Sequence, residues 1–273
     1  SYIAKKDLDS EMTVVRNEFE SGENDPASVL EERVTSTAFL WHNYGKSTIG
    51  SKADLENVPI DRLQAFYRKY YQPDNAVLVV AGKMDESKTI EMVNQYFGTT
   101  PRPAREIQPT YTNDPVQDGE RNVVLKRVGD VQVAVAAYHI PAGSHSDYAA
   151  IQVMLRILGT APSGRLYKTL VDTKKASSVA AYTYQFKEPF LAFAVAEVLK
   201  DKSLDDAKAT LLKTMDDMAA TPPTKEEVER AKNEIIKQIE LSFNSSQNVA
   251  LQLTTYSGMG DWRLLFLTRD RVK

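Results

Sequence analysis

The chain has 273 residues, of which 42% are hydrophobic and 26% charged, and its formal net charge is −3. This composition is typical of a globular protein, and the length favours two domains with enough apolar surface for a core in each. Acidic and basic residues are interspersed, so no basic surface for nucleic acid or for an anionic membrane is indicated. No apolar run reaches the roughly 18 residues of a membrane span. The absence of cysteine excludes disulfides and thiolate metal sites, and it leaves a periplasmic and a cytoplasmic location both open.

A helix is predicted over residues 7–19, and it carries the most informative spacing in the chain. Positions i, i+3, i+4 and i+7 share one face of a helix with about 3.6 residues per turn. Here that face reads Glu11, Val14, Val15 and Glu18. Two β-branched residues between the carboxylates indicate a buried face, and a buried carboxylate needs a cationic partner. A metal ion is one candidate for this partner, and a solvated pair of glutamates is the alternative.

The remainder of the first part alternates helices with one apolar run. The expected elements are a helix opened by Asp25 and Pro26, a helix opened by Pro59, a central strand at residues 76–82 and a helix at 85–97. Residues 98–121 then hold four prolines among polar residues without apolar periodicity, which is typical of an extended linker. We therefore expect residues 1–108 to be the back part of a first domain and 109–121 to be the linker.

Residues 122–273 are expected to form a second domain that begins with strands. The predicted elements are strands near 122–128 and 131–139, helices near 146–158 and 164–173, paired strands at 177–185 and 189–198, and helices at about 203–219, 224–243, 246–258 and from 261. Sequential strands with helices packed against them indicate an α+β fold.

An internal repeat bears on this architecture. Residues 227–234 match 11–18 at an offset of 216 (227 − 11), with two glutamates and an asparagine in common. A chance match is the alternative. If the repeat is real, the first copy lacks its front and the second lacks its end, as in a piece of a longer polypeptide. Arg230 and Ala231 lie between the second pair of glutamates, so an arginine can satisfy those carboxylates without a metal.

Short motifs spread over nearly the whole chain carry a family resemblance. They are Glu11-x-x-Val14-Val15-x-Asn17-Glu18, Gly22-Glu23-Asn24-x-Pro26, His42-Asn43-Tyr44-Gly45, Tyr71-Gln72-Pro73-Asp74-Asn75, Tyr138-His139-Ile140-Pro141, Ser163-Gly164-Arg165-Leu166-Tyr167 and Gly260-Asp261-Trp262-Arg263. With these motifs the chain resembles the pitrilysin/insulinase family of zinc metallopeptidases, which includes the mitochondrial processing peptidase. Each motif alone is weak, but their combination is specific.

The resemblance implies tandem two-layer α/β sandwich domains and a zinc site. By this resemblance Glu18 is the third protein ligand of a catalytic Zn²⁺, and Glu11 is a nearby carboxylate that supports the site electrostatically. The family's other zinc ligands lie on an upstream helix with the pattern His-x-x-Glu-His. There two histidines bind the metal and the glutamate is the general base for the metal-bound water.

The sequence departs from the family at this motif. Its histidines are His42, His139 and His145, no two of which are four residues apart, and no His-x-x-Glu-His occurs. Catalytic zinc normally takes three protein ligands. We therefore expect a fragment of a zinc metalloendopeptidase that is inactive alone, with zinc absent or weakly bound. The alternative is a non-catalytic structural or partner half of a peptidase complex.

The expected partners follow from these hypotheses. The substrate would be a peptide or small protein, and the protein partner would be another peptidase half or a second copy of the chain.

The three histidines are expected to have structural roles that follow from their places in the sequence. His42 is expected to make a structural hydrogen bond, His139 to end a strand, and His145 to be exposed before a helix capped by Ser144 or Ser146.

Overall fold

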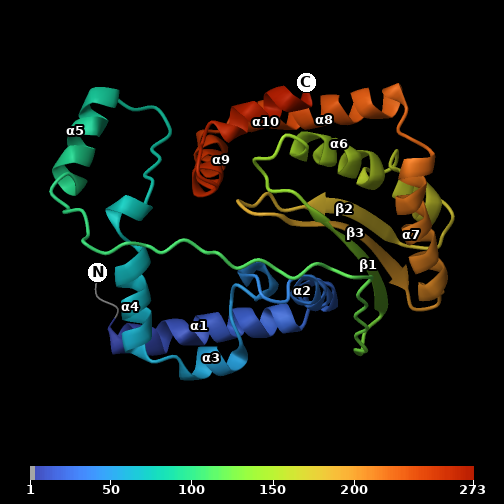
Figure 1. Cartoon of the computed structure of the whole chain (residues 1–273), viewed down its shortest axis with the longest axis horizontal. Helices are drawn as coiled ribbons and strands as arrows, with labels where there is room; N and C mark the ends of the chain where they lie inside the picture. The colour runs from blue at the N-terminus through green and yellow to red at the C-terminus, as the bar shows by residue number, and fades with distance from the viewer. Residues whose placement is uncertain (1–3) are drawn as a thin grey trace.

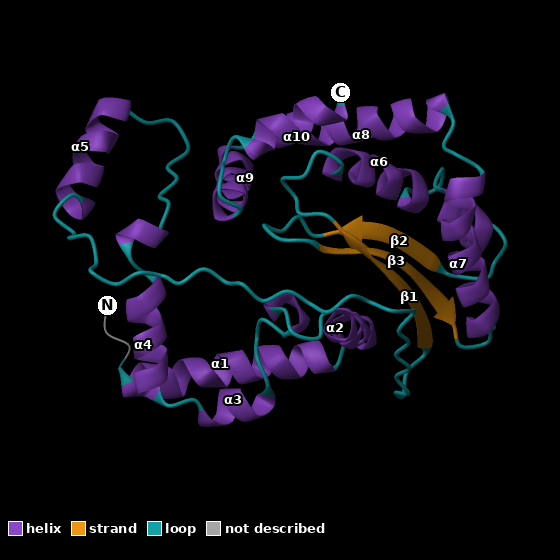
Figure 2. Ribbon diagram, viewed as in Figure 1, coloured by secondary structure: helices purple, strands orange, loops and turns teal. Residues whose placement is uncertain are grey.

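The computed structural model describes residues 4–273, apart from the side chains of residues 6 and 9, as helices arranged around one small sheet (Figures 1 and 2). The strands are β1 (Val131–Ile140), β2 (Ser178–Thr183) and β3 (Phe190–Leu199). They form an antiparallel sheet in the order β1–β3–β2. The predicted α+β fold is confirmed, as are the strand near 131–139 and the pair that follows it.

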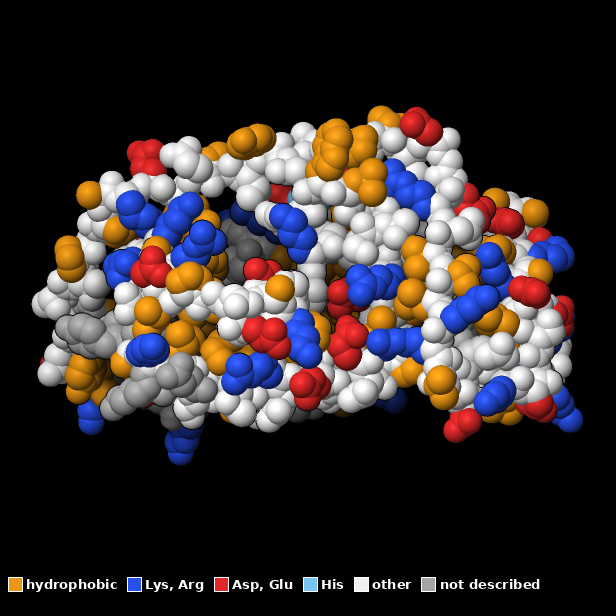
Figure 3. Space-filling model, turned by 90° about the horizontal axis from the view of Figure 1, so that it is seen from below, with side chains coloured by type: hydrophobic (Ala, Val, Ile, Leu, Met, Phe, Trp, Pro, Cys, Tyr) orange, Lys and Arg blue, Asp and Glu red, His pale blue; other side chains and the backbone are white. Residues whose placement is uncertain are grey.

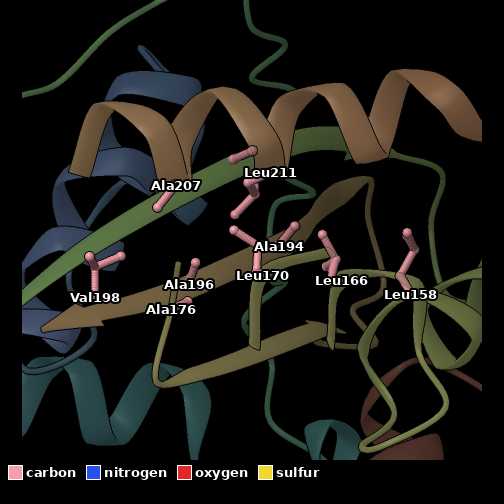
Figure 4. Close-up of a cluster of buried hydrophobic side chains, with 10 residues drawn as sticks. Leu158, Leu166, Leu170, Ala176, Ala194, Ala196, Val198, Ala207 and Leu211 are labelled. Atoms are coloured by element: carbon pink, nitrogen blue, oxygen red, sulfur yellow. The ribbon is translucent and has the colours of Figure 1, made fainter. Parts of the chain in front are cut away.

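One face of the sheet holds the main hydrophobic core. Alternate residues of β3 are small, namely Ala192, Ala194, Ala196 and Val198, and all are buried. Small side chains let helices pack closely on a sheet, as interior packing density requires. Leucines from α6 (Tyr148–Gly159), from the chain around the π-helical turn η3 (Tyr167–Val171) and from α7 (Leu204–Ala220) fill this face (Figure 4).

The opposite face of the sheet is covered by a helix from the first part of the chain. Helix α2 (Pro26–Ala38) packs against β1, and the residue after it, Phe39, enters a buried cluster with Phe190 and Phe193. The rings of Phe39 and Phe190 stack with 5.7 Å between their centroids. Residues 26–39 and the sheet of the second part are therefore joined by packing and not only by the linker.

Two helices pack on α6, namely α8 (Lys225–Ser242) and α10 (Leu264–Val272), and α9 (Ser246–Gly258) packs against α10. Ala149 of α6, Ile235 of α8 and Val272 of α10 form a buried cluster between them. Helix α8 begins with a capping box, in which Thr224 and Glu227 each bond the backbone N–H of the other.

The remaining helices have little core of their own. They are α1 (Lys5–Glu23), α3 (Lys52–Asn57), α4 (Ile60–Tyr70) and α5 (Glu86–Phe97), with the 3₁₀ turns η1 (Asn43–Gly45) and η2 (Pro73–Asn75) between them. None of the described side chains in these four helices is buried. Helix α5 stands well apart from the sheet (Figure 1).

Two predicted strands are absent from the described chain. Residues 76–82 are extended but have no sheet partner among residues 4–273, and Val77 and Leu78 are 64% and 58% exposed. Residues 122–128 are likewise unpaired, and the side chain of Val128 is fully exposed. Both segments have the apolar sequence of strands. A strand also needs a neighbouring strand to satisfy its backbone N–H and C=O groups. The sequence of the segment itself does not show whether such a neighbour is present.

The helix predictions are correct apart from two differences. Asp25 caps α2, with Pro26 in its first turn as predicted. The helix expected near 164–173 contains the π-helical turn η3, and α3 was not predicted. Residues 109–121 hold no helix or strand, and the proposed division at 108 and 122 stays a prediction.

Two observations concern the apolar helices and the charged surface. Among residues 4–273, no helix combines the length and the apolar composition needed to cross a bilayer. Acidic and basic side chains are mixed over the face seen from below in Figure 3 and do not gather into one basic patch there.

Candidate functional site

Helix α1 places the two predicted site residues on one surface. Glu11 and Glu18 are both exposed, and so is Val14, at 59%. Val15 is partly buried. The predicted buried face is therefore wrong for Val14 and for both carboxylates, because α1 packs on α2 and α3 and this side of it has no cover within the described chain.

The residues present fit one zinc ligand and not a complete zinc site. Glu18 makes no hydrogen bond or ion pair with the described residues, so its carboxylate is available as a ligand. Among the described side chains, no group of three or more His, Cys, Asp or Glu is placed to hold a metal ion. Because catalytic zinc takes three protein ligands, the other donors would have to come from outside these residues.

His42 has the structural role that was predicted for it. Its Nδ1 accepts a hydrogen bond from the backbone N–H of Tyr44 at 3.1 Å, and this caps η1. Nε2 therefore carries the proton in the neutral ring and donates to Glu188 Oε2 at 2.5 Å. This bond joins the loop after α2 to the loop between β2 and β3.

The other two histidines lie as expected, but the predicted cap is wrong. His139 is the second-last residue of β1, its ring meets Phe39 edge-on at 5.2 Å, and burial lowers its pKa. His145 is exposed before α6. The N-cap of α6 is Asp147 rather than Ser144 or Ser146.

A cavity of about 400 Å³ lies where the loop after α2 meets the linker and the second part of the chain. Its wall includes His42, His139, Asp114 and Glu188. Asp114 accepts the backbone N–H of Trp41 at 2.7 Å, and its other carboxylate oxygen is buried without a partner among the described residues. Sequence reasoning missed both acids, since each is an isolated residue in a polar segment without a motif.

Three further polar contacts join the two parts of the chain. The hydroxyl of Tyr182 donates to Glu31 Oε2 at 2.6 Å, and burial together with this bond raises the tyrosine pKa. Arg121 donates to the carbonyl of Thr37 at 2.8 Å, at the end of α2. Arg127 donates to Glu23, the last residue of α1. The end of each of the first two helices is thus bonded by an arginine from the segment before β1.

One glutamate of the second window, Glu227, is paired with an arginine, but not with the one predicted. Arg165 donates to both carboxylate oxygens of Glu227, at 2.9 and 2.8 Å, and to the carbonyl of Thr221 at 2.6 Å. The hydrogen bonds from Arg165, together with smaller contributions from Thr224, lower the pKa of Glu227 from 4.5 to about 2. Arg230, which lies inside the window, makes no such bond with the described residues. Arg165 lies 62 residues away in sequence, so the window's own spacing could not identify it.

The chain is similar to known proteins in sequence and in structure. The family described as the peptidase M16 inactive domain matches residues 57–235. The chain belongs to this family. Residues 1–56, which include Glu11 and Glu18, precede the matched range, so the match assigns no role to either glutamate.

Relatives of this M16 domain include named zinc proteases, which confirms the resemblance to zinc metallopeptidases. Zinc protease PqqE of Helicobacter pylori is 26% identical over 254 residues, covering 90% of this chain and 57% of the relative. The β subunit of the mitochondrial-processing peptidase of Lentinula edodes is 24% identical over 263 residues, covering 89% of this chain and 54% of that subunit. The chain thus spans little more than half the length of these relatives.

A solved structure shares the fold of this M16 domain over almost all of its length. The crystal structure of a protease from Helicobacter pylori superimposes with a TM-score of 0.91 and 25% sequence identity. The match covers 99% of this chain and 67% of that one. The arrangement of helices around the small sheet is therefore the arrangement found in a known protease.

Proposed function

We propose that this chain is part of a zinc-dependent metalloendopeptidase to which Glu18 supplies the third protein ligand of the metal. The observation that carries the proposal is the exposed face of α1, where Glu18 and Glu11 are presented without cationic partners among the described residues. Carboxylates that lack an internal counter-ion are suited to an external cation. The zinc proteases among the relatives make zinc the expected ion.

Glu11 is assigned a supporting role in this site. Seven residues of helix separate the Cα atoms of Glu11 and Glu18 by about 10.5 Å along the axis, which favours a single ligating carboxylate. Glu11 would then add negative charge near the cation without binding it, and such neighbouring groups tune a metal's affinity and electronics. When bound, zinc would activate a water molecule for attack on a peptide carbonyl.

The exposed apolar surface of the first part supports the view that this chain acts as part of a larger unit. Residues 76–82 have the sequence of a buried strand but lie exposed and unpaired within the described chain. Large side chains of the helices on either side are exposed as well, among them Phe66 of α4 and Ile90 of α5. Large exposed apolar side chains, where they gather into a patch, typically mark an interaction site. We propose that polypeptide outside this sequence covers it in the complete protease.

The second candidate is a non-catalytic partner half of a peptidase complex. The family's description as an inactive domain favours it. A partner half of this kind would bind an active peptidase half. A chain that contributes to the active site would instead bind a peptide or small-protein substrate.

The two candidates are separated by Glu18→Gln in the full-length gene product, with Glu20→Gln as the matched control. Glu20 is another exposed glutamate of α1, two residues from Glu18. If Glu18 binds zinc, its variant should lose bound zinc and at least about 100-fold in kcat/KM, while the control keeps both. Bound zinc would be measured by mass spectrometry and kcat/KM with a fluorogenic peptide. Full zinc content and full activity in Glu18→Gln would refute the assignment.

A further inference from the structure

The C-terminal end of α1 is bonded by a side chain from the matched M16 domain. Arg127 lies in the extended segment before β1, 104 residues beyond its partner in sequence. Its Nη1 donates to the backbone carbonyl of Glu23 at 2.6 Å, and its Nη2 donates to Oε2 of the same residue at 3.1 Å. One guanidinium therefore binds both the last carbonyl of the helix and the last carboxylate.

The charges at the C-terminal end of α1 explain why a bond from Arg127 stabilises this end. The last carbonyls of a helix lack partners within it, and they form the negative end of the helix dipole. Helix α1 has no basic residue in its last turn. Its C-terminal part instead carries Glu18, Glu20 and Glu23, and carboxylates near a helix C-terminus oppose the dipole. Arg127 supplies from outside the positive charge that the helix itself lacks.

Helix α1 has little buried packing, so a polar contact at its end contributes a larger share of what holds the helix in place. None of the described side chains of α1 is buried. The helix after it is well anchored, because Val29 of α2 is buried and Phe39 enters the aromatic cluster on the sheet. Residues 24 and 25 join the two helices. The end of α1 is therefore fixed through α2 on one side and by Arg127 on the other.

The geometry points to Arg127 as a positioning residue that holds the C-terminal end of α1, and with it Glu18, in place. Glu18 lies five residues before Glu23, about 7.5 Å along the helix axis, so fraying from that end reaches it within two turns. Arg127 belongs to the matched range 57–235. The M16 inactive domain would then support the helix that carries Glu18, the proposed zinc ligand. The link to zinc rests on the proposed function of Glu18, whereas the support of α1 does not.

The support of α1 is tested by hydrogen–deuterium exchange on this chain. In Arg127→Ala, amides of residues 19–24 should exchange about three- to tenfold faster, the size expected from losing a half-exposed ion pair and its carbonyl bond. Arg127→Lys keeps the charge but loses the planar pair of donors, so its rates should be intermediate. Lys126→Ala is the matched control, since Lys126 is a neighbouring exposed cation without a partner among the described residues.

Two exchange results would overturn the inference. In the first, Arg127→Ala and Lys126→Ala give the same rates in residues 19–24. In the second, exchange in Arg127→Ala accelerates equally in β3, which would show a general loss of stability rather than release of one helix end.

The link to zinc is tested on the full-length protein. Arg127→Ala should weaken zinc binding by about tenfold, in the range found when a residue that orients a metal ligand is removed, and Lys126→Ala should not. Unchanged zinc affinity together with a frayed α1 would overturn the positioning of Glu18 by Arg127. If instead Glu18→Gln keeps its zinc, the proposed function fails, while the exchange result for Arg127 stands by itself.

Discussion

Replacing Arg165 with alanine tests the bidentate ion pair between Arg165 and Glu227 in the second part. The guanidinium bonds both carboxylate oxygens of Glu227 and also the carbonyl of Thr221, so it ties the chain before η3 to the start of α8. Arg165→Ala removes all of these bonds and leaves the carboxylate, whose side chain is only 17% exposed, without its cation. We expect a clear loss of stability with the fold retained.

The magnitude follows from the pKa of Glu227. A shift from 4.5 to about 2 corresponds to about 3 kcal/mol, and Arg165 is its largest cause. The bonds from Thr224 remain in Arg165→Ala, and nearby solvent screens the charges, so the expected loss from the ion pair is about 1–2 kcal/mol. The lost bond to the Thr221 carbonyl adds about 1 kcal/mol. Arg165→Ala should therefore lower the free energy of unfolding by about 2–3 kcal/mol, and Tm by roughly 4–8 °C.

The same pair predicts how the effect depends on pH. A carboxyl group whose pKa is lowered by folding stabilises the protein fully above its unfolded pKa of 4.5, and this contribution is lost as the pH falls through about 2. The difference in Tm between the parent chain and Arg165→Ala should therefore be largest near pH 7. It should shrink steadily as the pH is lowered from 4.5 towards 2.

The assay is thermal unfolding followed by circular dichroism, with Arg230→Ala as the matched control. Arg230 is the arginine that lies inside the glutamate window but makes no bond to Glu227. Its removal should change the free energy of unfolding by less than about 0.5 kcal/mol. The reasoning is refuted if Arg230→Ala costs as much as Arg165→Ala, or if the effect of Arg165→Ala does not diminish in acid.

Two further predictions concern the core and the metal. Phe193 of β3 is fully buried in the aromatic cluster that also holds Phe39, so Phe193→Ala should cost about 3–5 kcal/mol. A loss below about 1 kcal/mol in urea unfolding would contradict that packing. Zinc added to this chain alone should bind weakly and produce no hydrolysis of a fluorogenic peptide. Tight binding of one equivalent in a calorimetric titration would show that this chain contains ligands besides Glu18.

Local signals in the sequence predicted the helices well. Asp25 followed by proline, and Asp85 before an amphipathic run, each mark a helix start through backbone contacts made within a few residues. Strands β2 and β3 could also be predicted locally, because they are close in sequence and pair with each other. The zinc-peptidase resemblance was also available from the motifs, because it depends on residue order rather than on contacts.

Features that depend on distant partners could not be predicted in this way. The apolar run at 76–82 has the composition of a strand, but pairing requires a neighbour that the described chain does not provide. Val14 has a pattern typical of burial, but burial depends on what packs against α1. The bonds of Glu188 with His42 and of Glu227 with Arg165 join residues 146 and 62 positions apart. No spacing within a helix or loop indicates such pairs.

The packing of α2 on the sheet also determines what proteolysis of the linker would produce. If residues 109–121 were cleaved, Phe39 would still lie against Phe190 and Phe193, and Tyr182 would still donate to Glu31. Separating the two fragments would expose these rings to water, and exposure of apolar surface is unfavourable. Cleavage should therefore leave a non-covalent complex of two polypeptides that migrates as one species until a denaturant dissociates it.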